Sequence, residues 1–210
     1  MINKNKVERG FSTSEFEQRL MRAQKIMKSN KLDGILITTP QNIRYFTGYD
    51  SQFWESPTRP WFVVVPASGK PIGIVPEIGE SEFKKTWLDE IKTWPSPRPE
   101  DEGISLVKST LDDLQKIYGQ IGAEFGKEMA IRMPVRDLFK LKDIVKTNIV
   151  DASDAIWEMR MIKTNAEVER IKHICSIASD AYYDLPTKLN IGDTEREAVS
   201  YTHLTLPTKA

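Results

Sequence analysis

The apolar positions near the start of the chain recur three or four residues apart, which is the period of a helix packed on a core. They are Phe16, Leu20, Ala23 and Met27. The capping-box pattern Ser12-Thr-Ser-Glu15 precedes them, so we expect an amphipathic helix over residues 13–29. Residues 33–39 are almost wholly apolar and end at Pro40, which predicts a strand buried on both faces of a sheet.

Two further strand-like runs lie close together in the sequence. Residues 61–66 and 71–76 are both apolar, and the turn-forming residues Ala67-Ser-Gly-Lys70 separate them, which predicts a hairpin. After it we expect a helix within residues 77–90, a strand over residues 91–94 and a proline-rich extended break over residues 95–99.

The alternation continues in the next part of the chain. There we expect a helix over residues 104–118, a strand over 128–132, a helix that begins at Pro134, a strand over 148–151 and a helix over 153–161. Helices thus alternate with short apolar strands, and one hairpin lies among them. This order favours an α/β sandwich, with a mixed sheet flanked by helices.

A second capping box marks the start of a different region. Thr164-Asn-Ala-Glu167 precedes a long helix, so we place a domain boundary near Ile162-Lys163. Another helix should begin after Gly192, with Thr194 and Glu197 as its cap partners.

The tail of the chain differs in composition from the helices before it. Residues 200–210 contain three threonines and a proline without an amphipathic continuation. This is typical of translated adapter sequence, and we expect the tail to be non-native. The expected regions are a flexible amino terminus (1–11), an α/β domain (12–162), the incomplete start of a further domain (163–199) and the tail (200–210).

The overall composition indicates a globular protein that does not bind nucleic acid. Of the 210 residues, 40% are hydrophobic, which is enough for a core. Thirty Lys and Arg residues balance thirty Asp and Glu residues, so the long-range attraction to phosphate that nucleic-acid binding needs is missing. Neither a signal-like segment nor an apolar run of membrane-spanning length is present, so we expect a cytoplasmic protein without a membrane partner.

Side chains suited to catalysis or metal binding are few. Cys175 is the only cysteine, so no internal disulfide can form, and this fits a reducing compartment. His173 lies two positions away, and on a helix that spacing points the two side chains to different faces, so no catalytic pair is expected. The adjacent acids Asp112-Asp113 and Glu100-Asp101-Glu102 are typical of a solvated face.

One stretch mixes aromatic and charged side chains. Residues 42–60 lie between two predicted strands and are too polar for a core strand and too aromatic for a plain linker. Its aromatic residues are Tyr45, Phe46, Tyr49, Phe53 and Trp54, with Trp61 just beyond, and among them lie Asp50, Glu55 and Arg59. Such a mixture suits contact with a ligand or another subunit, and a packed surface loop is the alternative.

Several short motifs follow one another along the chain. They are Asp33-Gly-Ile-Leu-Ile37, Asn42-Ile-Arg-Tyr-Phe-Thr-Gly48, Glu158-Met-Arg-Met-Ile-Lys163 with Glu167 and Ile171, and Gly192-Asp-Thr-Glu195. Their order and spacing resemble the creatinase, prolidase and aminopeptidase P family over about residues 12–199. The resemblance implies an N-terminal α/β domain of ribonuclease-H-like topology, followed by the first helices of a truncated pita-bread domain.

The chemistry of that family depends on its pita-bread domain. There, two aspartates, one histidine and two glutamates hold two divalent metal ions, which activate a water to attack an amide. The resemblance therefore implies manganese, cobalt or zinc in the full-length protein. The ligand segments do not lie in this sequence, so we expect no catalytic residue, no metal ligand and no cofactor in this chain.

The resemblance also implies a role for the aromatic stretch. In relatives of known fold, the N-terminal domain supports a homodimer and places this stretch at the mouth of the partner subunit's active site. The matching positions, which we expect to bind substrate, are Tyr45, Tyr49, Phe53, Trp54 and Arg59. The fork of Arg59 is suited to a substrate carboxylate, and the rings to a proline or a methylated guanidine. The alternative is that the rings pack the loop and Arg59 pairs with Glu55.

Three functions remain open on the sequence alone. The first is the substrate-access and dimerisation domain of a metal-dependent Xaa-Pro aminopeptidase or dipeptidase acting on small peptides, with the fragment itself inactive. The second is the same scaffold in a creatinase- or ectoine-hydrolase-like enzyme acting on another small amide. The third is a non-catalytic dimerisation module. It is disfavoured because the helix after Gly192 begins without a partner for its apolar face.

Overall fold

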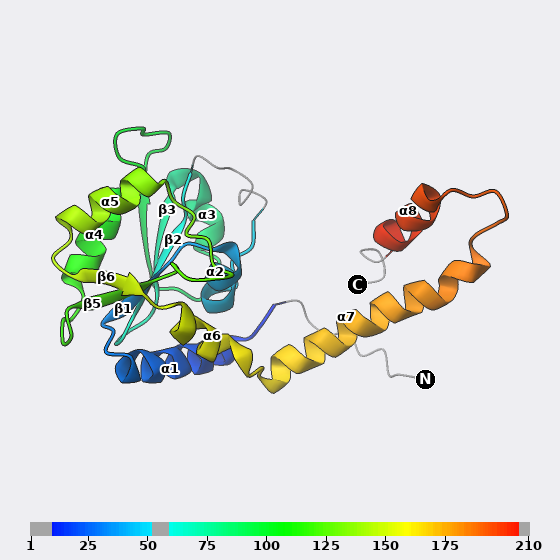
Figure 1. Ribbon diagram of the computed structural model, residues 1–210, viewed down its shortest axis with the longest axis horizontal. Helices are drawn as coiled ribbons and strands as arrows, with labels where there is room; N and C mark the ends of the chain where they lie inside the picture. Colours follow the sequence, from blue (N-terminus) through cyan, green and yellow to red (C-terminus); the bar gives the residue numbers. More distant parts are fainter. Residues whose placement is uncertain (1–9, 52–58, 206–210) are drawn as a thin grey trace. The chain divides into compact units, whose positions relative to one another are not determined.

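A computed structural model describes residues 10–51 and 59–205, whose backbone is drawn in colour in Figure 1. These residues belong to two compact units, one formed by residues 10–162 and one that begins in sequence at Lys163. Within the described ranges, no helix combines the length and the apolar character needed to cross a membrane.

Six strands of the first unit form one mixed sheet (Figure 1). They are β1 (Gly34–Ile37), β2 (Phe62–Pro66), β3 (Ile72–Pro76), β4 (Glu90–Trp94), β5 (Gln120–Ala123) and β6 (Asn148–Asp151). Their order across the sheet is β4-β3-β2-β1-β5-β6. Only β2 is antiparallel to its neighbours, because the pairs β1/β5, β5/β6 and β3/β4 are parallel. The expectation of a mixed sheet is confirmed.

Helices cover both faces of this sheet and complete three layers (Figure 1). One face carries α1 (Thr13–Ser29), α2 (Pro40–Thr47), α3 (Glu80–Phe83) and α6 (Ser153–Met161), and the other carries α4 (Ile104–Asp113) and α5 (Val135–Ile144). Ile35 and Ile37 of β1 point into the first core and Leu36 into the second. The central strand is apolar at successive positions because both of its faces are buried.

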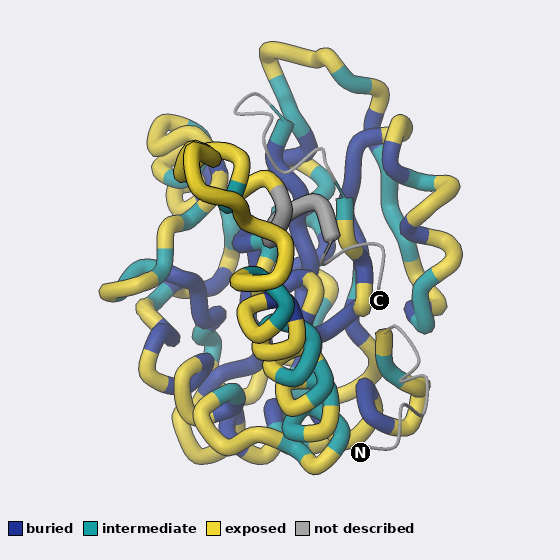
Figure 2. Tube along the Cα trace, turned by 90° about the vertical axis from the view of Figure 1, so that its right-hand side faces the viewer, coloured by how far each residue is buried: buried dark blue, intermediate teal, exposed yellow. Residues whose placement is uncertain are grey.

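The described part of the second unit is helical. It comprises α7 (Asn165–Asp184), the 3-10 turn η3 (Leu185–Thr187) and α8 (Glu195–Thr205). The predicted capping box of α7 is confirmed: Thr164 Oγ1 accepts from the Glu167 N–H at 3.2 Å, and Glu167 Oε2 accepts from the Thr164 N–H at 2.8 Å. Only Ala181 of α7 is fully buried, and Ile171 and Ile174 are exposed, so most of this helix carries the exposed or intermediate colour in Figure 2.

Most predicted elements are confirmed. The helices over residues 13–29 and 153–161, both strands of the hairpin, and the strands over residues 91–94 and 148–151 lie within one residue of their expected bounds. Ser12 caps α1 as expected, since its side chain accepts from the Glu15 N–H at 3.4 Å.

The aromatic stretch was wrongly predicted as a loop at its start. Residues 40–47 form α2, which begins at Pro40 and ends at Gly48 in the left-handed conformation, with φ 75°. Ile43, Phe46 and Thr47 are buried at helical spacing. A helix this short offers too few repeats for its period to stand out from a run of mixed polar and aromatic residues.

Two predicted helices are shorter in the structure. Within residues 77–90 only a 3-10 turn (η2, Glu77–Gly79) and α3 are helical, and Glu90 already belongs to β4. The helix predicted over residues 104–118 ends at Asp113. It ends early because the N–H groups of residues 117–119 bind the Asp33 carboxylate instead of continuing a helical ladder.

The strand predicted over residues 128–132 is wrong, because the strand that joins the sheet is β5 at residues 120–123. Gly122 lies in the middle of β5, and a Cβ there would come within 2.5 Å of the Ala152 side chain. The close approach of α6 to the sheet requires this glycine. In the sequence, however, a glycine weakens the signal of a strand.

Candidate functional site

The two tyrosines expected to bind substrate point into the protein. Tyr45, on α2, is buried, and its hydroxyl donates to the Met159 carbonyl at 3.0 Å. Tyr49 follows the helix and stacks on Trp61 with ring centroids 5.3 Å apart, while its ring lies 4.6 Å from that of Phe83. Burial raises the pKa of the Tyr49 hydroxyl. Both rings therefore belong to the core that supports the aromatic stretch.

The outer part of the aromatic stretch is described only at its end. Phe53 and Trp54 lie outside the described residues, and so does Glu55, the pairing partner expected for Arg59. Arg59 itself is half-buried, and its charge helps to lower the pKa of Glu102. Among the described residues, Glu102 is thus a carboxylate on which the charge of Arg59 acts.

Glu102 is held by several donors at the start of α4. Burial raises its pKa, but hydrogen bonds from Trp94, Arg98 and Ser96 and the charge of Arg59 lower it overall. The Trp94 indole N–H donates at 2.8 Å, the Arg98 N–H at 2.7 Å and the Ser96 hydroxyl at 2.9 Å. Glu102 was expected on a solvated face, and the structure corrects this, because its carboxylate organises the turn between β4 and α4.

A buried carboxylate that sequence reasoning missed lies at the carboxyl ends of β1 and β5. Glu124 is completely buried directly after β5. It accepts from the Thr38 N–H at 2.6 Å, the Thr38 hydroxyl at 2.9 Å and the Thr39 N–H at 3.0 Å, and also from the Thr39 hydroxyl and the Asn42 amide. These are all neutral donors around the first turn of α2, whose dipole also favours a negative charge there.

Asn42 connects this carboxylate to α6. Its Nδ2 donates to Glu124 at 2.5 Å, and its Oδ1 accepts from Arg160 Nη1 at 2.8 Å. The orientation of the amide is determined, because an ionised carboxylate can only accept and a guanidinium can only donate. Arg160 lies in the Arg160-Met-Ile-Lys163 motif, and its guanidinium is 5.8 Å from the Tyr45 ring centroid.

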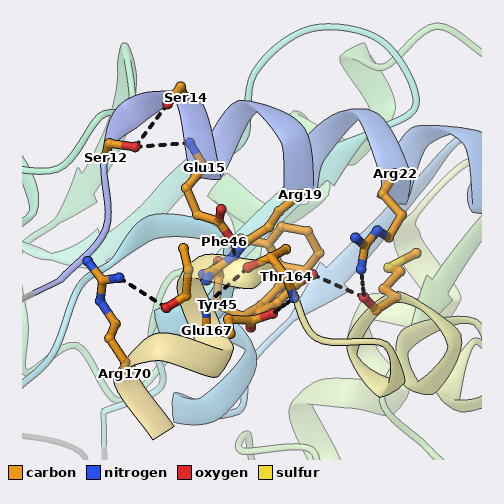
Figure 3. A network of polar contacts seen from close by, with 12 residues as sticks. Ser12, Ser14, Glu15, Arg19, Arg22, Tyr45, Phe46, Thr164, Glu167 and Arg170 are labelled. Atoms are coloured by element: carbon orange, nitrogen blue, oxygen red, sulfur yellow. Dashed lines mark hydrogen bonds and ion pairs between the residues drawn. The ribbon is translucent and has the colours of Figure 1, made fainter. Parts of the chain in front are cut away.

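Side chains of α1 and α2 also hold the last turn of α6, as Figure 3 shows around Arg22 and Tyr45. Arg22 donates to the carbonyl oxygens of Met159 at 3.2 Å and Ile162 at 2.8 Å. The Tyr45 hydroxyl shares the Met159 oxygen, and Arg19 donates to the Tyr45 carbonyl at 3.0 Å. The tyrosine of the aromatic stretch thus links three helices.

The acidic pairs do not form a metal centre. Asp112 accepts from Lys108 Nζ at 2.6 Å and from the Lys146 N–H at 2.9 Å, so its carboxylate is engaged with cationic and backbone donors. Within residues 10–51 and 59–205, no three His, Cys, Asp or Glu side chains are grouped to hold a metal ion. The donor set that a dinuclear centre needs is therefore not assembled by the described residues.

Comparison with known proteins supplies the context for this geometry. The family profile of the creatinase/prolidase N-terminal domain matches residues 19–162. A Xaa-Pro dipeptidase of Pyrococcus furiosus is 25% identical over 185 residues, which cover 88% of this chain and 46% of the relative. An uncharacterised hydrolase/peptidase of Sinorhizobium fredii is 42% identical over 165 residues, covering 75% of this chain and 41% of the relative.

A solved structure matches the fold as well. The recombinant prolidase from Thermococcus sibiricus superposes with a TM-score of 0.75 at 20% identity, over 94% of this chain and 51% of that one. The chain spans about half the length of the curated relatives it matches.

Proposed function

Since the chain belongs to the creatinase/prolidase N-terminal domain family, we propose that it is the substrate-access and dimerisation part of a metal-dependent Xaa-Pro dipeptidase-like hydrolase. The observation that carries the proposal is the family match over residues 19–162 together with relatives that are Xaa-Pro dipeptidases about twice as long. The substrate class is then a small peptide with proline in its second position, and the compartment is the cytoplasm.

The proposal assigns the metal ligands to the remaining half of such a protein. This chain contributes the α/β unit and the first helices that follow it. The two divalent ions, whether manganese, cobalt or zinc, would supply Lewis-acid activation of water when bound in the complete enzyme. The residues of this chain instead shape and support the approach to that centre.

The aromatic stretch has a divided role in this proposal. Tyr45 and Tyr49 anchor it from inside the core, and we assign substrate binding to Phe53, Trp54 and Arg59.

The purified 210-residue chain should not hydrolyse Ala-Pro or Gly-Pro, even with added Mn²⁺ or Co²⁺, because the ligands of the metal centre are assigned elsewhere. The measurement is proline release, with the Xaa-Pro dipeptidase of Pyrococcus furiosus as the positive control. Turnover that exceeds the buffer blank and disappears with a chelator would contradict the proposal that the metal ligands lie outside this chain.

The same chain should associate as a homodimer if the unit supports dimerisation. Sedimentation equilibrium then gives twice the monomer mass of 24.1 kDa. A species that remains monomeric up to about 100 μM, a range in which weak specific interfaces associate, would remove dimerisation from the proposal.

A further inference from the structure

The last turn of α6 is held from outside the helix. Its C-cap, Ile162, has φ −89° and ψ 113°, so the helical ladder stops there. The final carbonyl groups of a helix have no intrahelical donor. In α6, the carbonyl oxygens of Met159 and Ile162 accept hydrogen bonds from Arg22 of α1. The Met159 oxygen also accepts one from the Tyr45 hydroxyl of α2.

A second set of hydrogen bonds holds the same turn through the side chain of Arg160. Arg160 donates to Asn42, and Asn42 donates to the buried Glu124. Glutamine in place of Asn42 would be one methylene too long for both distances, and aspartate would set a second carboxylate against Glu124. The Asn42 amide thus bridges the Glu124 carboxylate and the Arg160 guanidinium of α6 through one hydrogen bond to each.

We propose that these side chains form a latch, which keeps the last turn of α6 closed at the end of the first unit. The members of the latch are Arg22, Asn42, Tyr45, Glu124 and Arg160. Arg160 and Asn42 act here as positioning residues. The inference needs only the contacts within residues 10–162, so it stands or falls separately from the proposed function.

The latch explains why this turn should not fray. Helix ends ordinarily open with a free-energy cost close to zero, because few contacts hold them. Hydrogen bonds from charged donors raise that cost, and three of them involve residues of this turn, namely Met159, Arg160 and Ile162. The backbone amides of this turn should therefore exchange hydrogen more slowly than those of an unsupported helix end.

Hydrogen–deuterium exchange of the 210-residue chain tests the latch. Arg160→Met keeps the aliphatic stem and removes the donor, and it should speed exchange in peptides covering residues 158–163 by about tenfold, the effect of losing one charge-assisted hydrogen bond. Arg22→Met should also speed exchange in these peptides, because it removes the hydrogen bonds to the Met159 and Ile162 carbonyls. Arg160→Lys, which keeps one cationic donor, should restore part of the protection.

Glu102→Gln serves as the matched control, because Glu102 is also a hydrogen-bonded carboxylate but lies in the turn before α4. It should leave residues 158–163 unchanged. The latch is overturned if Arg160→Met leaves their exchange unchanged, or if it speeds exchange equally in β1 and β5, since that result means a general loss of stability.

Discussion

Replacement of Glu124 by glutamine should lower the free energy of unfolding of the α/β unit by about 3 kcal/mol, and replacement by alanine by about 4 kcal/mol. The carboxylate accepts five hydrogen bonds in a site without solvent access. Glutamine turns one acceptor atom into a donor that faces other donors, and alanine leaves all five without an acceptor. Unsatisfied buried donors cost their full desolvation energy.

Urea unfolding followed by tryptophan fluorescence measures this loss. All five tryptophans of the chain lie within residues 54–157, so the signal reports the α/β unit. Glu17→Gln is the control, because Glu17 is exposed on α1 and should change stability by no more than about 0.5 kcal/mol. Equal unfolding midpoints for the Glu124 and Glu17 variants would show that the buried carboxylate does not stabilise the fold.

Asp33→Asn should cost about 2 kcal/mol at neutral pH, and this difference from the unsubstituted chain should shrink in acid. Asp33 is buried before β1 and accepts from the N–H groups of Ile117, Tyr118 and Gly119 at 2.6–3.1 Å. Burial raises its pKa, but these backbone donors outweigh burial, so the pKa lies below 3.8.

The direction of the pH dependence follows from that lowered pKa. An acid with a lower pKa in the folded state stabilises the protein above its unfolded pKa, here 3.8, and the contribution is lost as the pH falls through the folded value. The difference between the two proteins should therefore be constant from about pH 5 to 7 and decrease below about pH 4. Asp143→Asn, at an exposed position of α5, is the control. A difference that stays constant down to the acid transition would rule out this account.

The two carboxylates occupy equivalent places at opposite ends of one strand pair. Asp33 directly precedes β1 and binds the N–H groups just before β5, while Glu124 directly follows β5 and binds the N–H groups just after β1. Each side chain therefore continues the hydrogen bonding of the parallel ladder beyond the last backbone pair. Both ends of the central β1/β5 pair are thus held by a buried carboxylate.

The sequence was sufficient for the elements whose periodicity is long or bounded by clear caps. α1, α6 and the β2/β3 hairpin were predicted within one residue, and a capping box marked the start of α7, because helical periodicity, capping residues or turn residues define these elements locally. β5 and α2 were not, because each is short and depends on partners far away in the chain. Gly122 is required in β5 because Ala152, the N-cap residue of α6, packs against it, and that contact is not visible in the sequence.

The local structure of the aromatic stretch was harder to predict than its place in the sequence. The aromatic stretch could be singled out by composition, but the burial of Tyr45 and Tyr49 depends on α2, whose helical character the sequence did not reveal. Glu124 was missed because nothing local distinguishes a buried acid with five donors from an exposed one. Its donors are more than eighty residues away.

The pairing of β1 with β5 also constrains the order of folding. The partners of Glu124 lie 82 to 86 residues away in the chain, and closing a flexible loop of that length costs about 4 kcal/mol of chain entropy. The β2/β3 hairpin closes a far shorter loop and can form first, which in turn draws β1 into place beside β2. The central parallel pair is then a late event, and the two carboxylates that fasten its ends should mainly slow unfolding rather than speed folding.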